Sequence, residues 1–274
     1  MPVLNILITF SDSIRGKRQV NRFFATFCKM PATQGGSVEL NEEDRKKLVK
    51  DALFHVITQE AKRPVIKRPD VFKAIGLTGR TKELQDSIWN RTIKDLKDVF
   101  GYQMKELDDK KGFILVNLFE DSCHQEMRHI IYDDKDKTHI GLLIVVLSVI
   151  YMNNGVVKEE TLFGFLKKLN LFDDNDPKKE FEPFGNVKNL IDKEWCNKQH
   201  YIQLEKDELA ASSSGDPDQN QYKYRWGERA FAEVKKSDVL KFVASVYEKK
   251  PNEFTEEYEN IINEEGEGIF EEDK

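Results

Sequence analysis

The feature that most constrains the fold is a plan that occurs twice along the chain: three segments with helical periodicity, then two short β-prone runs around a turn. In the first copy the runs are YQMKEL and FILVN, separated by DDKKG. In the second they are YIQLEK and QYKYRW, separated by DELAASSSGDPDQN. Three helices followed by a hairpin form the winged-helix variant of the helix-turn-helix. The sequence therefore predicts a mainly α protein with small β wings, built from tandem winged-helix domains.

The helices of the first copy are predicted from end signals and apolar spacing. Asn41 is placed to cap a helix that continues to about Glu60. Two Arg-Pro pairs then predict an extended turn and a short helix, because the residue before a proline avoids the α conformation. A third helix follows Gly79, and its expected inward residues are Leu84, Ile88, Leu96 and Val99.

The second copy contains the longest apolar stretch, IGLLIVVLSVIYM at residues 140–152. Its 13 residues fall short of the about 20 that a membrane-spanning helix needs. It is therefore predicted to be a central core helix, with no membrane partner. Further helices are expected over 158–169 and 186–198, and after the second hairpin Gly227 marks the change from strand to a helix running through VLKFVASVYE.

Changes in composition predict where the domains end. We expect a flexible amino-terminal tail over 1–38 and an acidic tail over 249–274, where EEGEGIFEEDK holds six acids and one lysine. Between them the expected units are a first winged helix (39–121), a linker (122–137) and a second winged helix with a C-terminal helix (138–248). The amino end has its apolar part before its basic part, the reverse of a secretory signal. A mitochondrial-type leader and a start at Met30 both stay open.

Charge and motifs argue against an enzyme. The net charge of −6 disfavours nonspecific adhesion to nucleic acid, although residues 62–97 hold ten Lys/Arg against four acids. Cys28, Cys123 and Cys196 are far apart and encode neither a zinc ribbon nor a disulfide framework, so a reducing compartment is expected. Phosphate-loop, dinucleotide and nucleophile-elbow motifs are absent, and CHQEMRH is not HExxH. We expect no catalytic residue, no metal and no cofactor.

Four segments in order resemble the melanoma-antigen (MAGE) homology domain family, over roughly residues 39–246. They are LKDVFGYQMKELDDKKGFILVN, HIGLLIVVLSVIYMNNGVVKEETLF, GNVKNLIDKEWCNKQHYIQLEK and YKYRWGERA. The last, with its Trp-Gly-x-Arg-Ala run, is the most telling. The tail VLKFVASVYEKKPNEFTEEY is most similar to the branch of the family that serves the SMC five/six complex.

The resemblance implies a function and partners. It implies a nuclear, non-catalytic scaffold in chromosome maintenance and DNA repair. The first winged helix would hold a RING-type ubiquitin ligase subunit, the second a kleisin subunit, and the assembly would include the SMC heterodimer and touch DNA. Two rivals stay open: a MAGE-type adaptor for a different RING ligase, and a stand-alone winged-helix regulator that reads specific bases.

The family's ligase-binding surface includes a leucine pair in the first helix, and the matching positions here are Leu53 and Phe54. This departure keeps the apolar character but changes the shape. Adjacent residues lie about 100° apart around a helix, so at most one points squarely inward. Either Phe54 is exposed at an interface, or both side chains merely pack.

The remaining candidate residues carry a structural alternative as well. A kleisin surface is expected among second-domain residues such as Leu142, Leu143, Leu240 and Phe242, for which core packing is the plain alternative. DNA contact is assigned to Lys188, Lys193, Lys198, Arg91, Lys94 and Lys97, which otherwise keep a helical surface solvated. Trp195 and Trp226 are expected in the core, with Arg229 bonded or stacked within the fold.

Overall fold

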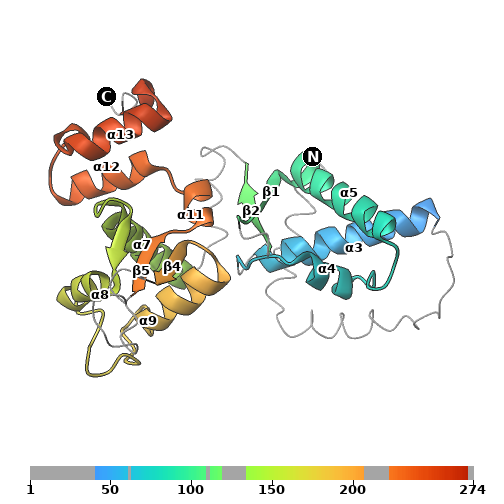
Figure 1. The fold of residues 1–274 in the computed structure, drawn as a ribbon, viewed down its shortest axis with the longest axis horizontal. Helices are drawn as coiled ribbons and strands as arrows, with labels where there is room; N and C mark the ends of the chain where they lie inside the picture. Colours follow the sequence, from blue (N-terminus) through green and yellow to red (C-terminus); the bar gives the residue numbers. More distant parts are fainter. Residues whose placement is uncertain (1–40, 61–62, 109–111, 119–133, 207–221, 271–274) are drawn as a thin grey trace.

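Two lobes side by side make up the computed structural model (Figure 1). The structure describes residues 41–60, 63–108, 112–118, 134–206 and 222–270. Each lobe has its own cluster of buried apolar side chains. The protein is mainly helical with small antiparallel sheets, which confirms the predicted fold class of tandem winged helices.

The first domain consists of three helices and a two-stranded wing. Its elements are α3 (Glu42–Glu60), α4 (Arg68–Ala74), α5 (Lys82–Phe100), β1 (Tyr102–Glu106) and β2 (Phe113–Asn117). The strands pair antiparallel, with Tyr102 opposite Asn117 and Glu106 opposite Phe113. The predicted hairpin is confirmed in type and position.

Local signals set the ends of these helices. The Asn41 side-chain oxygen accepts a hydrogen bond of 2.7 Å from the Asp44 N–H, as an N-cap should. At the end of the third helix, Gly101 closes α5 in the left-handed conformation (φ 67°), and its N–H donates to the Leu96 and Lys97 carbonyls. Because glycine adopts this conformation without strain, the chain turns directly from α5 into β1.

Trp89 organises the core of the first domain. Its ring meets Phe72 edge-on at 5.9 Å and Phe113 at 5.3 Å, so it connects α4, α5 and β2. Ile88 and Leu96 are buried as predicted, but the inward placement of Val99 is wrong, since 66% of that side chain is exposed. Helical spacing identifies the side of a helix that faces inward, but it does not determine how far along the helix the core extends.

The second domain has the same plan with one more strand. Its elements are α7 (Asp134–Tyr151), β3 (Val156–Lys158), α8 (Glu159–Lys168), α9 (Val187–Asn189), the π-helix η1 (Leu190–Lys198) that continues it, β4 (Ile202–Lys206) and β5 (Tyr222–Trp226). The sheet order is β3-β5-β4, all antiparallel. The sequence did not predict β3, whose three residues are too few for a visible alternation.

Trp226 and Gly227 have structural roles. Trp226 is 4% exposed and donates its indole N–H to the Leu147 carbonyl at 2.9 Å, so its predicted core position is confirmed, as is that of Trp195. A side chain at Gly227 would place its Cβ 2.3 Å from the His200 carbonyl oxygen. Trp226 therefore anchors β5 to the core. Gly227 lets the backbone pass close to the chain segment that precedes β4.

The region after Gly227 differs from its prediction. Instead of one helix there are two, α11 (Glu228–Glu233) and α12 (Lys236–Val246), because Val234 and Lys235 are extended. The segment assigned to an acidic tail contains the helical turns η2 (Pro251–Glu253) and η3 (Glu267–Phe270) and the helix α13 (Thr255–Glu265). Ile261 of α13 is fully buried, and α13 lies along α12 (Figure 1). One buried isoleucine among many acids gives too little apolar periodicity to predict such a helix.

Some predictions fall on residues outside the described ranges. These are the tail over 1–38, most of the linker 122–137, the long loop of the second wing, Cys28, and the Cys123, His124 and His129 cluster. Among the described residues, no helix is both long and apolar enough to cross a membrane.

Candidate interaction surfaces

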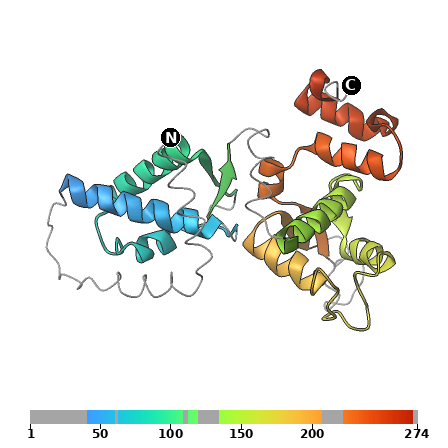
Figure 2. The same cartoon turned by 180° about the vertical axis from the view of Figure 1, so that it is seen from behind.

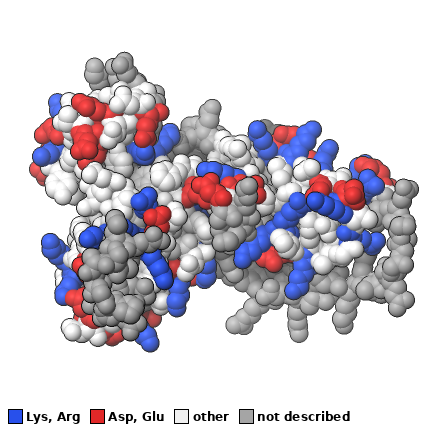
Figure 3. Space-filling view, viewed as in Figure 1, with Lys and Arg blue, Asp and Glu red and all other residues white. Residues whose placement is uncertain are grey.

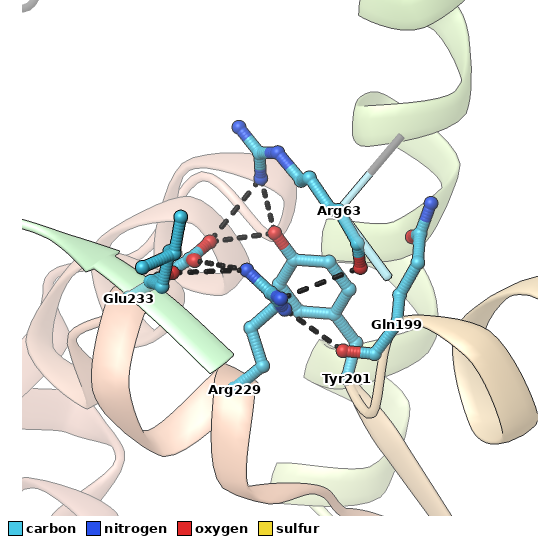
Figure 4. Close-up of polar contacts among 6 residues, drawn as sticks. Arg63, Gln199, Tyr201, Arg229 and Glu233 are labelled. Carbon is cyan, nitrogen blue, oxygen red and sulfur yellow. Dashed lines mark hydrogen bonds and ion pairs between the residues drawn. The ribbon is translucent and has the colours of Figure 1, made fainter. Parts of the chain in front are cut away.

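A buried arginine connects the two domains. Arg229, on α11, is fully buried, and its guanidinium donates to four acceptors. Two are main-chain carbonyls of the first domain, Leu115 on β2 at 3.1 Å and Arg63 just beyond α3 at 3.3 Å. The other two are the Gln199 carbonyl at 2.8 Å and the Glu233 carboxylate at 2.9 Å (Figure 4). The fork of guanidinium donors thus joins main-chain segments from both domains.

Further polar groups surround this arginine. The Tyr201 hydroxyl donates to Glu233 at 2.6 Å and accepts a hydrogen bond from Arg63, which also pairs with Glu233 at 3.2 Å (Figure 4). Glu60 lies at the same place, and burial raises the pKa of its carboxyl to about 7, against the opposing effect of Arg229 and Arg63. Glu233 adds a smaller upward effect on the pKa of Glu60. We call Arg229, Arg63, Tyr201, Glu233 and Glu60 the interdomain cluster.

Two hydrogen bonds outside the cluster also cross between the domains. The Val65 N–H donates to the Lys198 carbonyl at 3.0 Å, and the Asp108 N–H donates to the Glu228 carboxylate at 2.8 Å. From the front and from behind, α11 lies against the first-domain wing (Figures 1 and 2). The domains therefore meet along main-chain hydrogen bonds and buried charge.

The predicted ligase-binding residues point in different directions. Phe54 is 40% exposed on α3, whereas Leu53 is partly buried against the first-domain core. This is the geometry in which one of two adjacent helical residues faces out. It favours the exposed alternative for Phe54, and ligase binding through it stays a prediction.

The predicted kleisin-binding residues are mostly interior. Leu142 and Leu143 on α7 and Leu240 on α12 are buried, while Phe242 on α12 is 37% exposed. Of these four, Phe242 alone offers a partner surface in this arrangement of the chain. Two neighbours on the same helix and just after it, Val246 and Tyr247, are exposed as well. The sequence indicated Val246 as an apolar residue able to pack on a domain or a partner, but it did not single out Tyr247.

The predicted DNA-contact lysines of the second domain are largely engaged within it. Lys188 pairs with Glu159 of α8 at 2.7 Å and lies over the Phe163 ring. Lys198 pairs with Glu194 at 2.5 Å, and Lys193 is exposed. Two of these three lysines therefore neutralise the domain's own carboxylates, and phosphate contact would compete with those pairs.

On the first domain the basic candidates lie along α5. Arg91 pairs with Asp95 at 2.9 Å, while Lys94 and Lys97 are exposed. The view in Figure 3 shows lysine and arginine mixed with acids over both lobes, without an unbroken basic face. On this face, phosphate contact would therefore depend on individual cations and not on a continuous basic patch.

Metal and nucleophile chemistry find no support in the described residues. No group of three His, Cys, Asp or Glu there could hold a metal ion. Cys196 is buried, and this burial raises the pKa of its thiol to about 12, which keeps it protonated and unreactive.

Comparison with known proteins identifies one family and several relatives within it. The family model of the MAGE homology domain matches residues 54–237. The human protein "Non-structural maintenance of chromosomes element 3 homolog" is 31% identical over 212 residues, which cover 77% of this chain and 64% of that protein. Human "MAGE-like protein 2" is 32% identical over 206 residues, 75% of this chain and 15% of that protein.

A solved structure is similar as well. A chain in the structure titled "Nse1-Nse3-Nse4 complex" matches with a TM-score of 0.66 and 28% identity, covering 81% of this chain and 99% of that one. The present chain spans just under two thirds of the first human relative and a small part of the second.

Proposed function

Because the chain belongs to the MAGE homology domain family, we propose that it is a non-catalytic scaffold that joins a RING-type ubiquitin ligase subunit to a kleisin subunit in the SMC five/six complex. The observation that carries the proposal is the match to nearly the whole of one chain in an Nse1-Nse3-Nse4 complex. The similarity to the human protein named for maintenance of chromosomes supports a nuclear location and a role in DNA repair.

The geometry supports a bridging role. Each domain has its own hydrophobic core, and each carries a partly exposed phenylalanine among the predicted partner-binding residues, Phe54 on the first and Phe242 on the second; Phe231 on α11 is exposed as well. Partly exposed aromatic side chains are common anchors at protein interfaces. Two such anchors on separate domains suit a protein that holds two partners at once, with the ligase subunit on Phe54 and the kleisin on Phe242.

The first test is affinity purification of the tagged full-length protein from nuclear extract, with partners identified by mass spectrometry. A RING subunit, a kleisin and the SMC pair recovered together support the proposal. A RING ligase without a kleisin would replace it with the alternative of a MAGE-type adaptor for a different RING ligase. Recovery of neither would refute both.

Paired variants then assign the surfaces. Leu53→Ala with Phe54→Ala should lower recovery of the RING subunit at least tenfold and leave the kleisin in place. Val99→Ala is the matched control, because Val99 is exposed on the same domain. Phe242→Ala should do the reverse, with the exposed Leu169 as its control through Leu169→Ala. Intact ligase recovery by the folded double variant would sink the assignment of Phe54.

A further inference from the structure

The interdomain cluster contains a buried positive charge, on Arg229, that is not part of the proposed partner-binding surfaces at Phe54 and Phe242. The Arg229 guanidinium is fully buried, yet α11, which carries it, is only six residues long. A buried charge costs free energy unless it is paired and fully hydrogen-bonded. Arg229 meets this condition only while the first domain supplies the Leu115 and Arg63 carbonyls.

The two acceptors from the first domain are main-chain groups, so they hold the Arg229 guanidinium at one position relative to that domain. Main-chain carbonyls of β2 and of the turn after α3 cannot follow the arginine by rotating a side chain, as a carboxylate can. If the domains slid by a few ångströms, Arg229 would stay buried but lose two of its acceptors. Full separation would instead expose the guanidinium to water, which satisfies its donors. For Arg229 itself, a small displacement therefore costs more than complete separation.

We propose that Arg229 is the positioning residue of a two-state joint, which holds the two winged-helix domains either at one fixed angle or apart. Tyr201 and Glu233 brace the arginine from the second domain, and Arg63 reaches across to both of them from the first. The joint sets the angle at which Phe54 and Phe242 are presented. This last consequence rests on the proposed function, whereas the joint itself does not.

The test measures the distance between the domains in the isolated full-length chain. Glu83→Cys on α5 and Lys168→Cys on α8 place spin labels at exposed positions of the two domains. Cys28→Ser and Cys123→Ser remove two other thiols, and buried Cys196 stays unlabelled. Double electron–electron resonance then gives the distribution of label distances.

Arg229→Gln is compared with Arg225→Gln, the neighbouring exposed arginine that pairs with Glu205. The parent and Arg225→Gln should give one narrow distance peak. Arg229→Gln removes the penalty on small displacements, so it should broaden this peak continuously toward longer distances, with helix content unchanged by circular dichroism. An unchanged narrow peak, or a discrete second peak without intermediate distances, would overturn Arg229 as the residue that makes the joint two-state.

A second variant covers the case in which Arg229→Gln does not fold. Arg229→Lys keeps the charge but not the planar fork, so it cannot reach all four acceptors. The outcomes that would overturn the joint are the same as for Arg229→Gln. Binding of the RING and kleisin subunits recovered by affinity purification is measured in parallel and should change less than twofold in either variant. If neither subunit binds the parent protein, the proposed function fails while the distance measurement still decides the joint.

Discussion

The two winged-helix domains share a plan but use their third helices differently. On α5 of the first domain, Lys94 and Lys97 are exposed. On α9 and η1 of the second, Lys188 and Lys198 pair with Glu159 and Glu194. Equivalent positions therefore do not imply equivalent surfaces. A nearby acid, on the same helix for Lys198 and on α8 for Lys188, decides whether a lysine is already paired within its own domain.

The largest expected effect tests whether the two domains are energetically separate. Trp89→Ala and Trp226→Ala each remove a buried indole from a different core cluster. Each should cost about 3–5 kcal/mol of the unfolding free energy of its own domain. Hydrogen exchange measured by mass spectrometry should show protection lost mainly within the mutated domain. Equal loss in both domains would mean that the interface makes them one folding unit.

A pH titration tests the interface between them. In the unfolded chain the Glu60 carboxyl titrates near pH 4.5, whereas in the folded protein its pKa is about 7. Between these values the folded state keeps a proton that the unfolded state releases, so stability falls as pH rises through this window. The loss should be on the order of 1–3 kcal/mol.

Glu60→Gln supplies the control for this titration, because its amide cannot ionise. Denaturant unfolding of both proteins at pH 4.5 and at pH 7.5 gives the comparison. The difference in stability between the parent and the variant should grow in the variant's favour as pH rises. A difference that stays constant with pH would show that Glu60 does not titrate in this range.

The two third helices can be compared through single lysines. Lys188→Ala breaks a partly buried pair between α9 and α8 and a contact with the Phe163 ring, so it should cost about 1 kcal/mol of stability. Lys94→Ala on exposed α5 should change stability by less than about 0.5 kcal/mol. Thermal unfolding of the two variants measures both effects, and equal effects would show that the two lysines contribute alike to stability.

DNA affinity should depend more on the lysines of α5 than on those of the second domain, the reverse of the order for stability. This is the smallest of the expected effects. Lys94→Ala with Lys97→Ala should weaken binding of a short duplex severalfold, and Lys198→Ala should change it less than twofold. Fluorescence anisotropy at about 50 and about 200 mM salt separates phosphate contact from other binding, since phosphate contacts weaken with salt. A salt-independent signal, or a larger loss with Lys198→Ala, would argue against the first domain as the DNA surface.

Much of the fold could be predicted from local patterns in the sequence. Asn41 caps a helix with its own side chain, and Gly227 stands where strand β5 changes to helix α11, so both could be placed from the sequence. The three-residue β3, the break between α11 and α12 and the helix α13 were missed. Each depends on contacts with distant segments and leaves little periodicity in its own residues.

The candidate surfaces divide in the same way. Adjacent Leu53 and Phe54 could not both face inward, and the sequence alone established that. Which of the two is exposed, that Leu142 and Leu143 are interior, and that Val99 is not, depended on which elements pack against each helix.

The sequence by itself determined the repeated helix and hairpin plan, because periodicity, caps and turn residues act over a few positions. The tertiary structure decided what Arg229 does. Its four acceptors come from residues 63, 115, 199 and 233, and three of them are main-chain carbonyls, which every residue has. Because a residue of any type can supply a main-chain carbonyl, the sequence does not indicate which residues accept these hydrogen bonds. Only the folded structure identifies them.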